Sequence, residues 1–499
     1  MNRVTRWYDY ITFNIYFLGL TTLSQTNGTV IPLLVEHFMG SEQKGTYFGI
    51  YRLWTLMMAL LAQAFFGMLS DRSRLRWGRR RPFIFTGTLL DVVFVAAIAL
   101  TAGLAGYSVD GGQNATGFWL MFGVAVLLQI SSNLAHSAQQ GVMPDLVPEE
   151  KRGRFSAVKA MLELPIPLIL VALVIGPIFK NEALSFAAKI GVGMAVAMGV
   201  VLLSMGIAMF IPEKRREEAP PPLDWKPFLR LLVMTAIFTA IILGTGWLTQ
   251  QVQGWVAAIA SLPGLLVIMG VVGLVAMLIS VGLGVWLSVQ ISVGQEATRR
   301  NPSFTWWVVN RLAFLVGATN LSTFVVYYFQ ARLGYEKTEA ASPAFMLQLF
   351  VGVFILLSAL PAGWLSDRFG KKRMAMISGL IGAVGTVVAL SVPSLPVIYV
   401  GGSIIGIATG LFFTANWALG TVLVPKAEAG RYLGISNLAG AGAGAVGAYI
   451  GGPIADFVSA RAFELTGTEG LGYMLLFGIY GMMFLLSSLA LVKVKEPKV

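Results

Sequence analysis

The sequence contains no cysteine, two histidines and few charges. Without cysteine among its 499 residues, disulfides and thiolate metal sites are excluded. His37 and His136 are too few for a histidine-rich metal site, and we expect no metal and no cofactor. Charged residues make up 12% of the chain, against roughly 25% in soluble domains. A soluble fold of this length would lack the polar surface it needs, so the composition favours a chain covered by lipid.

The sequence is rich in long apolar runs. Hydrophobic residues account for 56% of the chain, and the mean hydropathy is +0.74. A membrane-spanning helix needs about 20 apolar residues. By that length the sequence predicts about fourteen spans, near 9–35, 44–69, 82–106, 117–143, 154–179, 186–211, 228–250, 255–292, 304–332, 342–366, 373–393, 395–423, 431–458 and 471–492. The first run is too long for a cleavable signal peptide, so none is expected.

Basic residues set the predicted orientation of these spans. With the N-terminus in the cytosol, 27 of the 36 Lys and Arg residues fall in cytosolic segments, 6 fall outside and 3 lie within spans. This bias predicts an integral membrane protein with both termini cytosolic, in the cytoplasmic (inner) membrane of a prokaryote. Anionic lipid facing the basic loops accounts for the net charge of +12, so we expect no nucleic-acid partner.

Two motifs occur twice, in the same order. The segment Gly67–Arg72 (GMLSDR) matches Gly363–Arg368 (GWLSDR), and Leu146–Pro148 matches Leu423–Pro425. Parallel repeats of this kind are typical of transporters. The duplication predicts an N-terminal six-helix bundle (1–211), a cytosolic linker (212–227), an inserted two-helix hairpin (228–299) and a C-terminal six-helix bundle (300–499).

With these motifs the chain resembles the major facilitator superfamily. The residues that carry its loop signature are Gly67, Asp71, Arg72, Gly78, Arg79 and Arg80, repeated at Gly363, Asp367, Arg368, Gly370, Lys371 and Lys372. The stretches Arg76–Ile84 and Pro144–Arg154 are more specifically similar to the sucrose-transporter-like branch, the glycoside–cation symporters and their solute-carrier-45-type relatives. The resemblance covers roughly 1–212 and 300–495. It implies an all-α polytopic membrane protein with the major facilitator fold.

The resemblance also implies that the two signature loops act as a conformational gate. A carboxylate at a helix end can bridge to a basic residue or cap a neighbouring helix. The candidate gate residues are Asp71, Arg72, Arg79, Asp367 and Arg368. The alternative is topology alone, because arginines hold a loop in the cytosol.

Several ionisable residues fall within predicted spans, where each costs about 2.5–3.5 kcal/mol on insertion scales. The candidates for proton coupling are Glu163, His136, Asp91 and Lys159. Lys159 and Glu163 are one helical turn apart, so a simple ion pair is the alternative for them. Arg52 either snorkels or binds an anionic group. It stands on the second helix, which has no acid between Gly45 and Leu69, so the sodium site of melibiose-type carriers is not expected.

Polar residues at one depth predict a substrate site. His136, Arg311 and Asn416 lie ~12–14 Å from the cytosolic ends of their helices. The resemblance implies that helices one, four, seven and ten line a central cavity. The candidate substrate-binding residues are Asn27, Gln129, Asn133, His136, Gln140, Arg311, Asn320, Asn416 and Trp417. Amides, a guanidinium and aromatic rings suit a polyhydroxylated ligand.

These features predict a monomeric secondary transporter for a sugar or glycoside, either coupled to protons or uncoupled, with membrane lipid around it. A second hypothesis is an exporter of amphipathic, drug-like compounds. A third is a non-transporting membrane factor that binds a partner, a lipid or a pigment. An enzyme is not expected, because the sequence shows no nucleophile–base pairing, phosphate-cradling loop or metal-ligand spacing.

Overall fold

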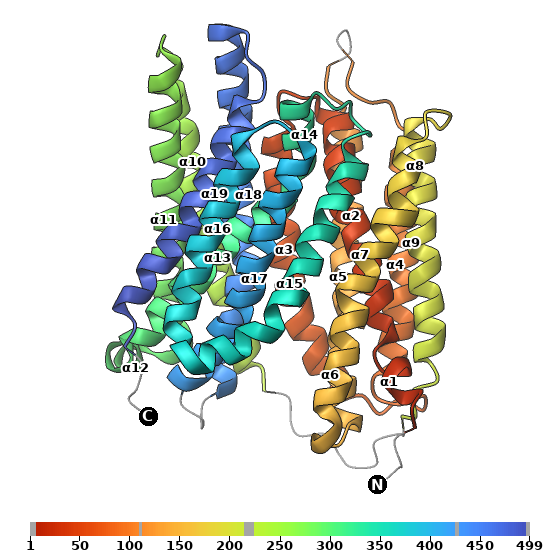
Figure 1. Ribbon diagram of the computed structural model, residues 1–499. Helices are drawn as coiled ribbons and strands as arrows, with labels where there is room; N and C mark the ends of the chain where they lie inside the picture. The colour runs from red at the N-terminus through yellow and green to blue at the C-terminus, as the bar shows by residue number, and fades with distance from the viewer. Residues whose placement is uncertain (1–5, 109–111, 214–223, 425–428, 496–499) are drawn as a thin grey trace. The chain divides into compact units, whose positions relative to one another are not determined.

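The computed structural model describes residues 6–108, 112–213, 224–424 and 429–495, which are helical over most of their length (Figure 1). The chain divides into two compact units. The first unit comprises Met1–Phe38 and Met58–Phe228, and the second comprises Met39–Met57 and Leu229–Val499. The helix α3 (Lys44–Ser70) therefore contributes its first part to the second unit and its remainder to the first.

The first unit is built from helices that follow one another along the chain. Besides the end of α3 they are α1 (Asp9–Thr12), α2 (Ile15–Met39), α4 (Arg81–Thr101), α5 (Ala115–Leu146), α6 (Glu149–Glu163), α7 (Pro165–Leu170), the π-helix η1 (Val171–Ile175), α8 (Gly176–Lys180) and α9 (Phe186–Ala208). Helix α4 packs against both α5 and α9. The predicted span 154–179 is present but interrupted next to prolines. Leu164 precedes Pro165, and the π-helix precedes Pro177, because proline disfavours helical backbone before it and cannot donate a backbone hydrogen bond.

The second unit holds the remaining helices. They are α10 (Lys226–Val256), α11 (Leu262–Val293), α12 (Gln295–Arg300), α13 (Pro302–Thr323), α14 (Val325–Leu333), α15 (Ala341–Phe369), α16 (Lys371–Ser391), α17 (Leu395–Leu423), α18 (Ala429–Thr466), α19 (Leu471–Ala490) and the 3-10 helix η3 (Leu491–Lys493). Helix α17 packs against α15 and α16, and α19 packs against α13, α16 and α18. Small residues allow these contacts: a Cβ on Gly401 would lie 2.6 Å from the backbone nitrogen of Ala389.

The number of candidate membrane spans in the structure is close to the number predicted from the sequence. Among the described residues, twelve helices are long and apolar enough to cross a membrane, and α13 and α14 form a thirteenth span that bends by 56°. Helix α2 corresponds to the first predicted span but falls outside this set, because seven of its residues between positions 21 and 29 are Thr, Ser, Gln or Asn. The prediction of an all-α polytopic membrane protein is confirmed, and about fourteen was an approximate count.

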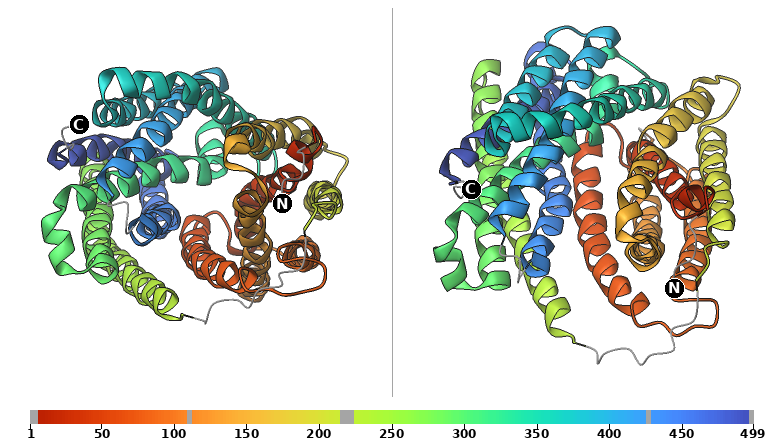
Figure 2. Two further views of the ribbon diagram at one scale, coloured as in Figure 1. Left: turned by 90° about the horizontal axis from the view of Figure 1, so that it is seen from below. Right: turned by 60° about the horizontal axis from the view of Figure 1, so that its bottom comes forward.

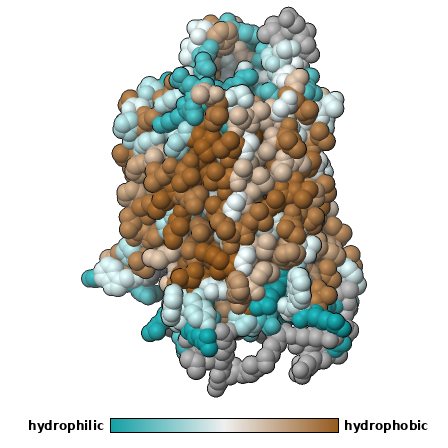
Figure 3. Space-filling model, turned by 90° about the vertical axis from the view of Figure 1, so that its right-hand side faces the viewer, coloured by the Kyte–Doolittle hydropathy of each residue, from teal (hydrophilic) through white to brown (hydrophobic). Residues whose placement is uncertain are grey.

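The surface matches a chain immersed in lipid. On the face shown in Figure 3, apolar residues form a broad band across the middle of the helices. Hydrophilic residues gather at both ends of the helices on that face. This distribution is what a bilayer requires, because polar side chains are costly in its hydrocarbon core.

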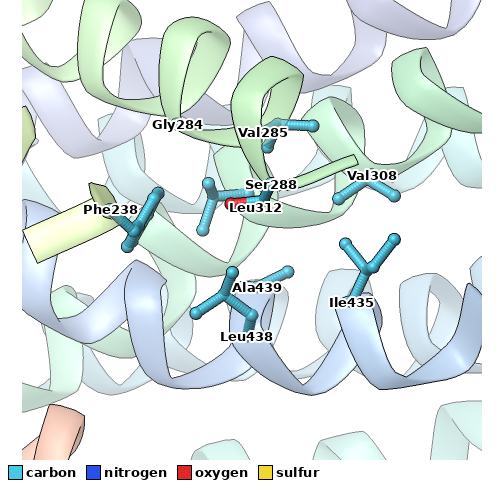
Figure 4. A pocket seen from close by; sticks show the side chains of 9 residues that line it. All are labelled: Phe238, Gly284, Val285, Ser288, Val308, Leu312, Ile435, Leu438 and Ala439. Atoms are coloured by element: carbon cyan, nitrogen blue, oxygen red, sulfur yellow. The ribbon is translucent and has the colours of Figure 1, made fainter. Parts of the chain in front are cut away.

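Helices α10 and α11, which the sequence analysis predicts to be an inserted hairpin, lie side by side (Figure 2) and pack within the second unit. The hydroxyls of Thr245 and Ser280 share a hydrogen bond of 2.7 Å between them. The Phe238 ring lies against Gly284 of α11 and Gly442 of α18, where a Cβ on either glycine would overlap it. Beside this ring, side chains from α10, α11, α13 and α18 line a small apolar hollow (Figure 4). One face of the hairpin is therefore packed against protein.

We predict that Phe238→Ala destabilises the second unit. The substitution removes the ring that fills the space between Gly284 and Gly442, so we expect a loss of about 3 kcal/mol of unfolding free energy. The measurement is the melting temperature of the purified protein in detergent. Trp255→Ala is the control, because that side chain is 79% exposed and should change the melting temperature little. Equal shifts for both variants would contradict the packing described.

Candidate substrate and gating sites

The first unit brings together a histidine–lysine cluster, consisting of Phe17, His136, Gln140, Lys159 and Glu163. Gln140 Nε2 donates to His136 Nε2 over 3.1 Å, and the imidazole meets the Phe17 ring edge-on at 6.2 Å between centroids. Lys159 Nζ lies 4.3 Å from the centroid of the same ring and 3.5 Å from Glu163 Oε2. The structure contains the Lys159–Glu163 ion pair that the sequence analysis named as the alternative, and both Lys159 and His136 contact the Phe17 ring.

Asp91 lies apart from this cluster, fully buried between α4 and α5. Ser131 donates its hydroxyl hydrogen bond to Asp91 Oδ1, and Oδ2 has no hydrogen-bond partner in the described part of the chain. Thr88, one turn before Asp91 on α4, shares a hydrogen bond of 2.6 Å with the hydroxyl of Tyr16. Asp91 is therefore an acid held by a hydroxyl rather than by a cation.

The second unit contains an arginine–asparagine cluster, made of Trp307, Asn310, Arg311, Asn416 and Trp417. Arg311 Nη1 donates to Asn416 Oδ1 over 3.0 Å, and Asn416 Nδ2 donates to Asn310 Oδ1 over 2.8 Å. Asn310 Nδ2 in turn donates to the carbonyl of Ser487 over 2.9 Å. Each amide is oriented by the next, so the chain of bonds holds the Arg311 side chain in one direction.

Two tryptophans complete this cluster. Trp307 is fully buried, and its Nε1 donates to the Asn416 carbonyl over 2.9 Å. Trp417 is 46% exposed, and the Arg311 guanidinium carbon lies 5.7 Å from the centroid of its ring. The sequence analysis missed Asn310 and Trp307. Asn310 is next to Arg311 in the chain, but neighbouring residues point about 100° apart on a helix, so its link to Asn416 could not be foreseen.

The other substrate candidates differ in their surroundings. Asn320 is fully buried and donates to the carbonyls of Val316 and Ala443, so it joins α13 to α18. Asn133 donates to the carbonyl of Gln129 on its own helix. Gln140 is exposed and also accepts from Gln63. Asn27 is half-buried, and its Oδ1 has no partner within the described residues. Of these, Gln140 is the exposed side chain, whereas the Oδ1 atom of Asn27 is buried.

The first signature loop is organised around Arg80 rather than Arg79. Arg80 is 4% exposed, and its guanidinium donates to Ser70 Oγ over 2.6 Å, Asp71 Oδ1 over 2.5 Å and Asp145 Oδ2 over 2.9 Å. Arg79 binds the same Asp71 oxygen at 2.7 Å from a more exposed position. The arginine–carboxylate network, comprising Ser70, Asp71, Arg79, Arg80 and Asp145, joins the ends of α3 and α5 to the start of α4.

Glu213 caps the start of α4 in the same region. Both of its carboxylate oxygens accept from the Arg80 backbone nitrogen at 2.8 Å, and Oε2 accepts from that of Arg81 at 3.0 Å. The first backbone N–H groups of a helix lack partners within it and carry partial positive charge, so a carboxylate stabilises them. Gly78 makes room for this carboxylate, since a side chain there would overlap Glu213, and its φ of +112° favours glycine.

The second signature loop is assembled differently. Lys372, which aligns with Arg80, donates to the Val494 carbonyl over 2.7 Å. Asp367 and Arg368 are exposed, and the Arg368 guanidinium lies over the Trp364 ring. Asp145 aligns with Val422, so the second copy has no carboxylate at that place. The two copies therefore share a motif without sharing a network.

A second anchored helix end lies at the other terminus of α3, within the second unit. Asp456 of α18 accepts from the backbone nitrogens of Gly45 and Thr46 at 3.0 and 2.7 Å, and from the Thr46 hydroxyl at 2.7 Å. Tyr473 of α19 donates to the same carboxylate over 3.1 Å. Lys44 Nζ donates to Gln330 of α14 over 2.6 Å. Asp456 thus stabilises the first turn of α3 as Glu213 stabilises that of α4.

Comparison with known proteins agrees with this architecture. Residues 307–499 match the model of the Major Facilitator Superfamily. Over 90 residues the chain is 34% identical to the minor myo-inositol transporter IolF of Bacillus subtilis (strain 168). That stretch covers 18% of this chain and only 20% of the length of the relative.

Solved structures resemble the whole chain. The nucleoside transporter NupG, crystallised as a point mutant, has a TM-score of 0.63 at 10% identity, covering 97% of this chain and 100% of that one. The D-xylose-proton symporter has a TM-score of 0.62 at 16% identity, covering 98% of each chain. The chain therefore has the fold of these major facilitator transporters. The sucrose-transporter-like branch stays a prediction.

We predict that Arg80→Gln destabilises the protein more than Lys372→Gln, its counterpart in the repeat. The first substitution leaves Asp71 and Asp145 close together without their buried cation, which should remove about 3 kcal/mol of unfolding free energy. The bonds that the second substitution removes include those from one ammonium group to the carbonyls of Val494 and Val492, at 2.7 and 3.5 Å, and the shorter is worth about 1 kcal/mol. Melting temperatures in detergent test this order, and a reversed order would contradict the central place of Arg80.

The cap on α3 generates a graded prediction. Asp456→Asn removes the charge and one acceptor from the first turn of α3, so we expect a loss of about 2–3 kcal/mol of unfolding free energy. Tyr473→Phe removes a single hydrogen bond to the same carboxylate and should cost about 1 kcal/mol. Thermal unfolding of both variants is the measurement. An unchanged melting temperature in Asp456→Asn would show that the cap contributes nothing.

Proposed function

We propose that this protein is a secondary transporter that moves a sugar or glycoside across the membrane by alternating access, coupled to protons. The observation that carries the proposal is the arginine–asparagine cluster. It places oriented hydrogen-bond donors beside an exposed indole ring, inside helices long enough to span a bilayer. Polar groups in such helices are costly unless they face a cavity or a partner.

The chemistry of the cluster suits a polyhydroxylated solute. The guanidinium N–H groups of Arg311 can donate to hydroxyl oxygens, and the exposed ring of Trp417 offers an apolar face for a sugar ring. The fold adds support, because it is shared with a D-xylose-proton symporter and a nucleoside transporter. A short stretch also resembles a myo-inositol transporter. Each of these named solutes carries several hydroxyl groups.

Contacts at the two ends of α3 support alternating access. The Arg80 network holds the Ser70 end, and Asp456 holds the Lys44 end, about 40 Å away along the helix. The first lies in one compact unit and the second in the other. Contacts that form in only one conformation bias the equilibrium between states. Both anchors are formed in the described conformation, and the proposal requires at least one of them to break when the carrier changes state.

Proton coupling is assigned to the first unit. Glu163 and Lys159 form a pair that protonation of the carboxylate would weaken, and His136 contacts the same Phe17 ring as Lys159. Asp91 offers a further carboxylate, held by the Ser131 hydroxyl. The second unit has no comparable acid facing its arginine–asparagine cluster among the described residues.

Uptake into proteoliposomes tests the function. The purified protein should take up at least one member of a panel of radiolabelled pentoses, hexoses, disaccharides and polyols. An imposed inward proton gradient should raise the initial rate several-fold, and a protonophore should abolish that increase. Glu163→Gln should retain binding but lose the stimulation, because its neutral side chain cannot change charge. Protein-free liposomes are the control, and neither binding nor uptake of any solute by folded protein would refute the proposal.

A further inference from the structure

Two arginines of the second unit lie within membrane-spanning helices without a carboxylate partner. Arg311 donates to the neutral Asn416, and its Nε is buried without a hydrogen bond. Arg52 of α3 also has a buried Nε that lacks a partner, and its side chain makes no hydrogen bond to any described residue. In the described part of the chain neither guanidinium forms an ion pair. No carboxylate of the described residues therefore neutralises their positive charge.

The two guanidiniums lie along the same helix of the unit. A Cβ on Gly444 would lie 3.1 Å from Arg52 Nη2 and 3.7 Å from Thr319 Cγ2, so Arg52 reaches the level of Thr319 on α13. Thr319 follows Arg311 by eight residues, which is about 12 Å along the helix axis. Positive charge thus extends along α13 over roughly the length of a small solute.

Acids elsewhere in these helices are already engaged. Asp456 of α18 is occupied by the first turn of α3 and by Tyr473. In the first unit, by contrast, the cation Lys159 has its acid, Glu163, one turn away. Among the described residues, one intramembrane cation, Lys159, thus has a carboxylate partner, whereas Arg52 and Arg311 have none.

We infer that the solute carried by the proposed transporter bears an oxyanion, a carboxylate or a phosphate, that binds Arg311, with Arg52 as the second cation along its path. This inference rests on the proposed function and narrows its substrate class to acidic sugars and sugar phosphates. The oxyanion takes the free N–H groups of Arg311, while the polyhydroxylated part lies against the Trp417 ring.

An oxyanion fits these groups better than a hydroxyl does. A guanidinium presents paired N–H groups that match the two oxygens of a carboxylate or phosphate, and such charge-assisted bonds are stronger than those to neutral acceptors. Unpaired positive charge in a region of low dielectric also attracts anions from solution. The amide chain from Ser487 through Asn310 and Asn416 holds Arg311 ready for such a ligand.

Matched solutes that differ only in charge test the inference. Galactose, galacturonate and galactose 6-phosphate share a ring, as do myo-inositol with its 1-phosphate and uridine with its 5′-phosphate. Binding to the detergent-purified protein is measured by ligand-induced thermal shift, and uptake is measured in proteoliposomes. We expect an anionic member to bind at least tenfold more tightly than its neutral partner. Preference for galacturonate or for the phosphates identifies which oxyanion is carried.

Arg311→Gln should weaken binding of the anionic member by about tenfold to a hundredfold. It should weaken binding of the neutral member by a smaller factor, because that member loses hydrogen bonds to hydroxyl groups and no charge pairing. Arg311→Lys should restore part of the loss for the anionic member because it retains the charge. Arg300→Gln is the matched control, since Arg300 is an exposed arginine paired with Glu296. The melting temperature of each variant without ligand shows that it is folded.

The outcomes separate this inference from the proposed function. If neutral solutes are bound and transported as well as or better than their anionic partners, the oxyanion inference is wrong and the transporter proposal stands. The same holds if Arg311→Gln weakens both kinds of solute equally. If folded protein neither binds nor transports any solute, the transporter proposal fails and the inference fails with it.

Discussion

The cost of placing a charge in an apolar medium is the constraint on which this structure depends. A charged side chain within a span must find a partner or an aqueous cavity, because lipid offers neither. At the helix ends the same cost applies to a buried charge, and Arg80 binds a hydroxyl and two carboxylates where α3 and α5 end and α4 begins. Asp456 likewise takes the free N–H groups of α3. These contacts join the helix ends. Along their length the helices are held together by small residues, which allow close packing.

Most of the fold could be predicted from the sequence, because the membrane leaves few solutions. Each of the fourteen predicted runs corresponds to helical structure, and polar residues in α2 explain why that helix is less apolar than the others. The bend at Phe324 and the π-helix at Val171–Ile175 could not be predicted, since hydropathy measures the length of a span and not its hydrogen-bond pattern.

The sites were less predictable than the fold, for a physical reason. Depth within a span indicated Arg311 and Asn416, and the structure joins them. Their mutual orientation depends on Asn310 and Trp307, whose roles arise from contacts between helices. In the signature loop both Arg79 and Arg80 belong to the motif, and of the two the sequence analysis chose Arg79 alone as a gate candidate. Only burial distinguishes them, because Arg80 passes over Gly141 of α5, a contact between segments far apart in sequence.

The π-helix has a consequence for how its span can evolve and adjust. A π turn contains about one residue more than an α turn, so the helix before it and the helix after it are out of phase by about 100°. The segment Pro165–Leu170 therefore has a different angular register from the segment that carries Phe179, which contacts Gly193. One extra residue therefore changes the side of the span on which the residues after the π-helix lie.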